Sequence, residues 1–178
     1  MKAVFIDRDG TLGGGNKIEF PNELSLFDGT IQALKNLKDI GFKIIAFTNQ
    51  PDISRGLITK DEFEKELYSF GFDDVCICPH TLEDNCECRK PKTAMLELMV
   101  EKYLLNINES YVIGDRWSDM KAGQSMGMKI ILVRTGTGEA SINKYKDKWD
   151  IENVDFIASN FVEASEHIKG FIDTKMKK

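Results

Sequence analysis

Long apolar runs are absent from this sequence. No stretch approaches the roughly 18 consecutive apolar residues that a membrane-spanning helix needs. The first apolar run ends at Asp7, which leaves too few apolar residues for a signal peptide. With 42% hydrophobic and 30% charged residues, the 178 residues suit one domain with a sizeable core. We therefore expect a single globular domain over residues 1–178, cytoplasmic and without a membrane partner.

Grouped basic residues are scarce as well. The formal net charge is −5, and basic residues cluster only at Lys175, Lys177 and Lys178. Because neutralising a nucleic-acid backbone needs grouped cations, this charge pattern excludes nucleic acid as the main partner. We interpret the basic tail as the solvated end of a helix, and we expect a monomer.

Cysteine is absent outside one short segment, because all four cysteines fall between Cys76 and Cys88. A disulfide framework would spread its cysteines over the chain, whereas a tight group suits metal ligation in a reducing compartment. Zinc is the first candidate because it prefers thiolate and imidazole ligands.

What the sequence does contain is an alternation of apolar runs with segments of helical spacing. Apolar runs predict strands at 2–6, 44–47, 75–78, 111–113 and 129–133. Between them, helical spacing predicts apolar faces formed by Ile31, Leu34 and Leu37, by Phe63, Leu67 and Phe70, and by Met95, Met99 and Tyr103. This alternation implies a Rossmann-like α/β fold, in which helices cover both faces of a parallel sheet.

Local signals set several element boundaries. Thr59 followed by Glu62 forms a capping box at the start of one helix. Pro91 predicts the first turn of another helix, since proline is tolerated there. The polar segment 135–153 is predicted to be irregular, and Asn160 predicts the start of a last helix that packs on the sheet's edge.

Polar side chains follow three of the predicted strands. Asp7 comes directly after the first strand, Thr48 and Asn49 follow the second, and Asp115 follows the fourth. Because ligands of open parallel sheets bind beyond the carboxyl ends of the strands, we expect these side chains to share one pocket. Asp9 lies two residues after Asp7, and the glycine behind it allows a sharp turn that aims both carboxylates at the pocket.

This arrangement predicts phosphoryl transfer. Beside Mg²⁺, the Asp7 carboxylate can attack phosphorus, because the metal offsets the repulsion between two anions. Asp9 can protonate the departing alkoxide and then activate water, a contribution of about 10²–10⁴-fold. Thr48 and Lys90 can hold the equatorial phosphoryl oxygens. The predicted catalytic residues are therefore Asp7, Asp9, Thr48 and Lys90.

A second acidic pair completes the predicted magnesium site. Mg²⁺ prefers oxygen ligands, and Asp115 with Asp119 places two acids at a strand exit and a helix start. We predict that Asp115 binds the ion and that Asp119 supports it.

Four motifs together resemble the haloacid dehalogenase (HAD) superfamily of phosphatases. They are Asp7-Arg8-Asp9-Gly10-Thr11-Leu12, Thr48-Asn49-Gln50, Cys86-Glu87-Cys88-Arg89-Lys90-Pro91, and Gly114-Asp115 with Asp119. The resemblance covers roughly residues 3–138, and the nearest likeness is to the D-glycero-D-manno-heptose 1,7-bisphosphate phosphatase group with its relative, the histidinol-phosphatase domain. Little room is left between the first two motifs for a large cap domain, so we expect an open pocket for a small sugar phosphate.

The resemblance also implies roles for individual residues. Mg²⁺ would be held by Asp7, Asp9 and Asp115. Substrate would be contacted by Thr48, Asn49, Gln50, Arg89, Lys90 and Arg116. A structural zinc would be bound by Cys78, His80, Cys86 and Cys88 in a loop at 78–88. This zinc would hold Arg89 and Lys90 in place. Cys76 lies outside the pattern, and we interpret it as a core residue, with a spare zinc ligand as the alternative.

Other functions remain open at this point. A histidinol-phosphate or other small-molecule phosphatase is the first alternative, and a non-catalytic phospholigand-binding module is the second. A receiver domain would retain its phosphoryl group, a dehalogenase would not need Mg²⁺, and a polynucleotide phosphatase would need a basic groove. The sequence predicts a Mg²⁺-dependent hydrolase of phosphate monoesters that acts through a phosphoaspartate, with a heptose bisphosphate as the expected substrate.

Overall fold

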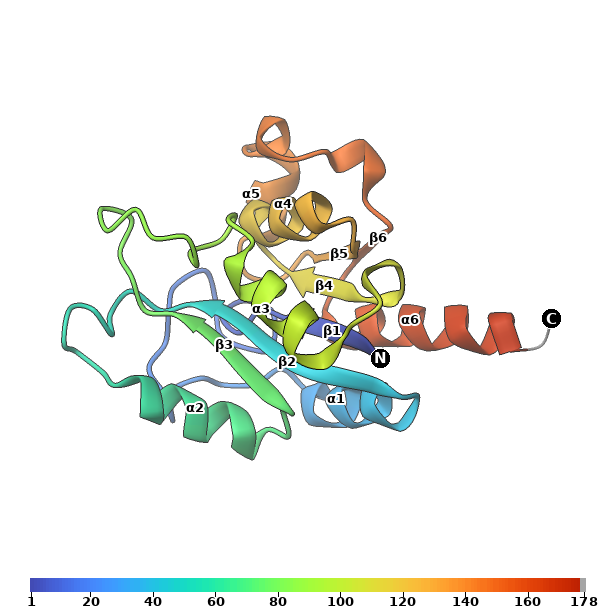
Figure 1. The fold of residues 1–178 in the computed structure, drawn as a ribbon, viewed down its shortest axis with the longest axis horizontal. Coiled ribbons are helices and arrows are strands. Elements are labelled where there is room, and N and C mark those ends of the chain that lie inside the picture. Colours follow the sequence, from blue (N-terminus) through green and yellow to red (C-terminus); the bar gives the residue numbers. More distant parts are fainter. Residues whose placement is uncertain (177–178) are drawn as a thin grey trace.

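A single parallel sheet organises the chain in the computed structural model, which describes residues 1–176 (Figure 1). The strand order is β3-β2-β1-β4-β5-β6. The strands are β1 (Lys2–Ile6), β2 (Phe42–Asn49), β3 (Asp74–Cys78), β4 (Tyr111–Gly114), β5 (Lys129–Val133) and β6 (Phe156–Ala158). All five predicted strands and the parallel α/β fold are confirmed. The sequence did not predict β6, because three residues are too few to show a period.

Helices cover both faces of this sheet, as Figure 1 shows. On one face lie α1 (Thr30–Asp39), α2 (Lys60–Ser69) and α6 (Phe161–Met176). On the other lie α3 (Ala94–Tyr103), α4 (Trp117–Met126) and α5 (Gly138–Asn143). A separate cluster of buried apolar side chains fills each face, which explains why the central strands carry apolar residues on both sides. The assignment of residues 1–178 to one domain stays a prediction.

Two of the predicted helix starts are confirmed by their hydrogen bonds. The Thr59 hydroxyl accepts from the Glu62 amide at 3.3 Å, and the Glu62 carboxylate accepts from the Thr59 amide at 3.0 Å. Asn160 caps α6, since its side-chain oxygen accepts from the Glu163 amide at 3.0 Å. Helix α6 then packs along α1 and beside β5 and β6, at the β6 edge of the sheet. The basic tail at 175–178 lies outside the residues whose side chains the structure describes.

Three local predictions were wrong. Pro91 does not open a helix, because α3 begins only at Ala94. The segment 135–153 is not irregular throughout, since it contains α5, which tertiary hydrogen bonds of Ser141 hold in place. Ile31 is 48% exposed, because the buried side of α1 follows a slightly different stripe of residues.

The order of the strands places the expected pocket at one point of the sheet. β1 pairs in parallel with β2 on one side and with β4 on the other. From β1 the chain adds β2 and β3 on one side of the sheet and then β4 to β6 on the other. Such a switch point between β1 and β4 opens a crevice beyond the carboxyl ends of the strands. Asp7 and Asp115 follow these two neighbouring strands. Both acids therefore emerge at the mouth of the same crevice.

Within residues 1–176, no helix combines the length and the apolar character needed to cross a bilayer.

Candidate active site and zinc loop

A buried lysine joins the predicted nucleophile to a second acid. Lys90 Nζ donates to Asp7 Oδ1 at 2.8 Å and to the Phe47 carbonyl at 2.7 Å, and it lies 2.6 Å from Asp119 Oδ1. Burial by itself lowers the pKa of Lys90, but the carboxylates of Asp119 and Asp7 outweigh burial, so its pKa is raised. Lys90 therefore stays charged beside the Asp7 oxygen.

Asp115 has one oxygen held and one oxygen free. Its Oδ2 accepts from the Thr137 amide at 2.6 Å and from the Thr137 hydroxyl at 2.7 Å, whereas its Oδ1 is buried without a partner. Burial, followed by the charges of Asp7 and Asp119, raises the pKa of Asp115 to about 8. A divalent cation would offset these costs of a buried carboxylate.

The three acids form a group that fits such a cation. One oxygen from each of Asp7, Asp115 and Asp119 lies within 4.8 Å of the others, and all three residues are buried. Both oxygens of Asp119 are engaged, Oδ1 by Lys90 and Oδ2 by the Arg116 amide at 3.0 Å. The supporting role of Asp119 stays a prediction, in which Asp7 and Asp115 would supply the oxygens for a hard metal ion.

Two glycines bring Thr137 to Asp115. The loops after β1 and β5 meet at Gly10 and Gly136, whose φ angles are +80° and +56°. A side chain at Gly136 would place its Cβ 2.3 Å from Asp115 Oδ2 and 2.6 Å from the Gly10 Cα, so only glycine fits. Sequence reasoning missed Thr137, because it lies in a segment read as irregular; a glycine close behind a strand was the only signal available.

Asp9 lies apart from this group. Its Oδ1 accepts from Arg8 Nη1 at 2.6 Å and from the Glu19 amide at 3.0 Å, and its Oδ2 accepts from Gln50 Nε2 at 2.7 Å. Burial raises the pKa of Asp9, and the Arg8 charge opposes that shift. The Asp9 side chain is thus held by three donors and is not part of the group formed by Asp7, Asp115 and Asp119, although the sequence analysis predicts that Asp9 also holds Mg²⁺. It does line the cavity beside Asp7.

Of the three residues in the motif Thr48-Asn49-Gln50, two line the cavity and the third lies behind them. Thr48 and Asn49 line the cavity, and Asn49 Oδ1 accepts from the Lys90 amide at 3.2 Å. Gln50 is fully buried and is not among the lining residues. Its amide nitrogen donates to Thr48 Oγ1 at 3.0 Å as well as to Asp9. The geometry therefore corrects the predicted substrate contact of Gln50, which bridges Thr48 and Asp9 behind the wall.

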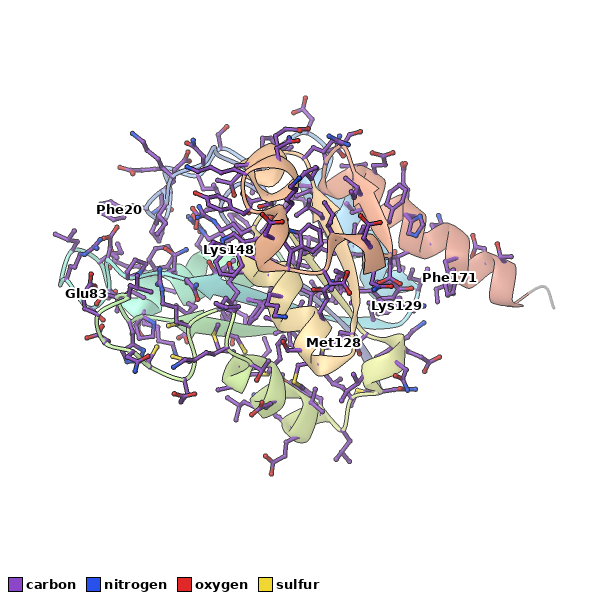
Figure 2. The ribbon with its side chains drawn as sticks, turned by 90° about the horizontal axis from the view of Figure 1, so that it is seen from above. Phe20, Glu83, Met128, Lys129, Lys148 and Phe171 are labelled. Carbon is purple, nitrogen blue, oxygen red and sulfur yellow. The ribbon has the colours of Figure 1, made fainter. Side chains whose placement is uncertain are left out.

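A cavity of about 350 Å³ opens above Asp7. Its cationic side chains include Arg89 and Arg116 besides Lys90. Arg89 Nη1 donates to the His80 carbonyl at 3.0 Å, and Arg116 Nη2 donates to the Asn16 carbonyl at 3.3 Å. The remaining lining residues are Asp9, Ile18, Thr48, Asn49, Leu82, Pro91, Trp117, Ser118, Thr137, Ser141 and Tyr145. Lys148, which Figure 2 labels, lies 5.0 Å from the centre of the Trp117 ring on this wall.

The predicted zinc ligands gather in the loop before Lys90. Cys78 and Cys88 have their sulfurs 3.3 Å apart, and Cys86 Sγ lies 3.6 Å and 3.5 Å from them. His80 Nδ1 lies 3.2 Å from Cys88 Sγ. A tetrahedral zinc with Zn–S distances of about 2.3 Å sets its sulfurs about 3.8 Å apart, so these four ligands fit a zinc ion.

Cys76 is not part of this cluster. It is 5% exposed, its thiol donates to the Met95 carbonyl at 3.6 Å, and it belongs to the apolar cluster under α3. The geometry supports its interpretation as a core residue rather than a spare zinc ligand.

Comparison with known proteins agrees with this architecture. Residues 87–164 match the model of the HAD-hydrolase-like family. The D-glycero-β-D-manno-heptose-1,7-bisphosphate 7-phosphatase of Pasteurella multocida is 32% identical over 170 residues, which cover 86% of this chain and 92% of that protein. The chain belongs to the HAD phosphatase family. The Haemophilus influenzae protein of the same name is 38% identical to this phosphatase over 159 residues, which cover 78% and 86% of the two chains.

Two further comparisons concern a longer protein and a solved structure. The histidine biosynthesis bifunctional protein HisB of Campylobacter jejuni is 40% identical to this phosphatase over 142 residues, covering 72% of the phosphatase but only 40% of HisB. The crystal structure of D,D-heptose 1,7-bisphosphate phosphatase from B. bronchiseptica, complexed with magnesium and phosphate, has a TM-score of 0.82 at 24% identity and covers 96% and 99% of the two chains. This second likeness establishes a shared fold.

Proposed function

We propose that this phosphatase hydrolyses a small sugar bisphosphate of the D-glycero-D-manno-heptose 1,7-bisphosphate class, with Asp7 as the nucleophile. The observation that carries the proposal is the pairing of Asp7 with the buried ammonium of Lys90, at the floor of a cavity whose wall bears Arg89 and Arg116. In this proposal, Lys90 holds the reacting phosphoryl group and the two arginines hold a second anionic group. The names of the relatives point to the same substrate class.

The residues fit Mg²⁺ as the metal of this site. Asp7 and Asp115 would supply carboxylate oxygens, with Thr137 holding Asp115 in place. Asp9 has its side chain engaged elsewhere, so its backbone carbonyl is the oxygen left for the predicted contact. When bound, the ion offsets the repulsion between the Asp7 carboxylate and the anionic phosphoryl oxygens.

The reaction then runs in two displacements at phosphorus. The Asp7 carboxylate forms a bond to phosphorus as the bond from phosphorus to the sugar oxygen breaks, and Asp9 gives its proton to the departing alkoxide. Lys90 and Thr48 donate to the phosphoryl oxygens throughout. In the second step, water loses a proton to Asp9 and attacks phosphorus, the bond to Asp7 breaks, and inorganic phosphate leaves.

Histidinol phosphate is the second candidate substrate, because HisB proteins are among the relatives. The cavity wall favours the bisphosphate. Apart from Asp7 and Asp9, no acidic side chain lines the cavity among residues 1–176, so a cationic amino alcohol would find no partner there. Arg89 and Arg116 would also repel its ammonium group.

A phosphate-release screen with Mg²⁺ tests the substrate assignment. We expect the highest kcat/KM with D-glycero-β-D-manno-heptose 1,7-bisphosphate, lower values with sugar monophosphates, and the lowest with histidinol phosphate and nucleoside monophosphates. A higher kcat/KM with histidinol phosphate than with any sugar bisphosphate would replace the proposed substrate by the second candidate.

Truncating a wall arginine tests the second anionic contact. We expect Arg116→Ala to lower kcat/KM for the bisphosphate by about 10–100-fold, because hydrogen bonds to a charged group contribute about 1.5–3 kcal/mol. The loss should be smaller for a sugar monophosphate. Arg134→Ala is the matched control, since Arg134 is exposed and pairs with Glu139 at the surface. Equal losses with both substrates would remove the second anionic contact from the proposal.

A cytoplasmic location and a monomeric state complete the proposal. Zinc ligation by Cys78, Cys86 and Cys88 requires free thiols, which a reducing compartment maintains.

A further inference from the structure

A charged pair lies buried beneath the pocket, where the proposed reaction does not use it. Arg8 is fully buried, and Glu66 of α2 is 8% exposed. Arg8 Nε donates to Glu66 Oε2 at 2.7 Å, and the guanidinium carbon lies 5.1 Å from the centre of the Phe63 ring. Replacing a buried ion pair by apolar residues is often neutral or stabilising, so stability alone does not account for this pair.

The pair contacts Asp9 through Arg8. Arg8 Nη1 donates to Asp9 Oδ1 at 2.6 Å, while its Nε is held by Glu66. The planar guanidinium fixes the angle between these two contacts, so the position of Glu66 sets the direction from which Asp9 is held. Gln50 Nε2 donates to the other Asp9 oxygen, Oδ2, at 2.7 Å.

Arg8 and Glu66 also bind the backbone of the segment 19–22, which lies next to the cavity. Glu66 Oε1 accepts from the Asn22 amide at 3.0 Å, and Arg8 Nη1 donates to the Glu19 carbonyl at 2.7 Å. The Glu19 amide in turn donates to Asp9 Oδ1 at 3.0 Å. Phe20, labelled in Figure 2, belongs to this 19–22 segment, which directly follows the lining residue Ile18. Both carboxylate oxygens of Glu66 therefore accept hydrogen bonds: Oε2 from Arg8, which contacts Asp9, and Oε1 from the Asn22 amide in the segment beside the cavity.

We propose that Glu66 is a positioning residue, which holds Asp9 through Arg8 in the orientation that lets Asp9 protonate the leaving group. The inference rests on the proposed function, because it requires Asp9 to act as the general acid. A purely structural Glu66 would affect folding or the amount of active enzyme. A positioning Glu66 affects the step that needs a proton.

Leaving groups of different basicity separate these two roles. A sugar alkoxide needs the proton from Asp9 as it departs, whereas p-nitrophenolate departs without one. The experiment measures kcat/KM of each variant for the sugar phosphate and for p-nitrophenyl phosphate, and it takes their ratio. Because both values come from one preparation, the fraction of folded enzyme cancels from this ratio.

The decisive variant is Glu66→Gln. The amide keeps the shape of the carboxylate, but its one oxygen can accept from only one of Arg8 Nε and the Asn22 amide, and its NH₂ group then faces the other donor. We expect the ratio of sugar phosphate to p-nitrophenyl phosphate to fall by about 10-fold or more, a part of the 10²–10⁴-fold range of general acid catalysis. Glu66→Asp, which keeps the charge, should restore part of the ratio. Arg8→Lys replaces the Glu66 variants if both are insoluble, and its ratio should fall as well.

Asp9→Asn and Asp74→Asn are the reference and the control. Asp9→Asn should lower the same ratio at least as much as Glu66→Gln. Asp74 is a buried acid paired with Lys102 at the start of β3, away from the carboxyl edge, so Asp74→Asn should leave the ratio unchanged.

The outcomes separate the inference from the proposed function. An unchanged ratio in Asp9→Asn would overturn the acid role of Asp9, and the inference with it. A lowered ratio in Asp9→Asn but not in Glu66→Gln, or an equal loss for both substrates in Glu66→Gln, would overturn the positioning role alone and leave the proposed function intact.

Discussion

Asp7→Asn is expected to lower kcat by at least about 10³-fold, as substitution of a catalytic nucleophile does in other hydrolases. The Asn side chain has nearly the same shape, but its neutral amide is a poor nucleophile toward phosphorus. It also leaves Lys90 Nζ without the ionic partner that lies 2.8 Å away. The fold should be retained, because the Asp7 backbone amide still donates to the Ile113 carbonyl.

Phosphate release under saturating Mg²⁺ measures this effect, with circular dichroism as the check on folding. The matched control is Asp39→Asn, which makes the same change at an exposed position at the end of α1. Wild-type turnover in the Asp7→Asn protein would remove Asp7 as the nucleophile, and the phosphoaspartate route with it.

Removal of zinc is expected to lower kcat/KM by about 10²-fold or more, because small displacements of a positioning group are enough for such a loss. Cys88 lies two residues before Lys90, and Arg89 is tied to the His80 carbonyl within the same loop. Without the ion, the thiols of Cys78 and Cys88 no longer hold the loop together. Lys90 then loses its fixed place beside Asp7.

A chelator or the Cys88→Ser substitution tests this expectation, with zinc content measured by metal analysis. Far-UV circular dichroism should change little, because Cys78, Cys86 and Cys88 are a small part of the apolar cluster that they join, and the other cluster does not include them. Cys76→Ala is the matched control, and it should keep zinc and activity, since Cys76 lies outside the ligand cluster. Full activity in zinc-free protein would contradict the scaffolding role, and zinc loss in the Cys76→Ala protein would contradict the ligand assignment.

Features that follow directly from the geometry of a parallel sheet could be predicted from the sequence. Apolar runs broken by Asp7 and Asp115 predicted that both acids leave adjacent parts of one sheet edge, and the strand order places them on the neighbouring strands β1 and β4. The clustering of Cys78, His80, Cys86 and Cys88 could be predicted because all four lie within eleven residues, where a short loop can bring them together.

Contacts between distant segments could not be predicted in this way. Thr137 reaches Asp115 only because the loops after β1 and β5 meet at Gly10 and Gly136. Helix α5 carries no clear apolar period, and it forms where Ser141 donates to the Asp115 carbonyl at 2.8 Å. No local pattern in a polar segment shows which distant backbone it will contact.

Side-chain orientation was equally inaccessible from local spacing. Asp9 and Gln50 both follow strands and were both expected to face the substrate or the metal. Asp9 does line the cavity, but Arg8 and Gln50 hold its carboxylate outside the group of Asp7, Asp115 and Asp119, and Gln50 itself lies fully buried behind the cavity wall. Which way a side chain turns after a strand depends on the partners that other elements bring to it.

By itself, then, the sequence determined the parallel α/β fold, the acids at the sheet's carboxyl edge and the clustering of His80 with three cysteines, because periodicity and short spacing act within a few turns of chain. Only the tertiary structure decided that Asp119 and Lys90 pair beside Asp7, that Thr137 leaves one Asp115 oxygen free, and that a buried pair on Arg8 and Glu66 holds Asp9. The paired residues lie far apart in the sequence, from 22 positions for Asp115 and Thr137 to 83 positions for Asp7 and Lys90. Arg8 and Asp9 are sequence neighbours, but Arg8 is also bound by Glu66 of the distant helix α2. Their geometry is fixed by how the strands are ordered, which no local pattern encodes.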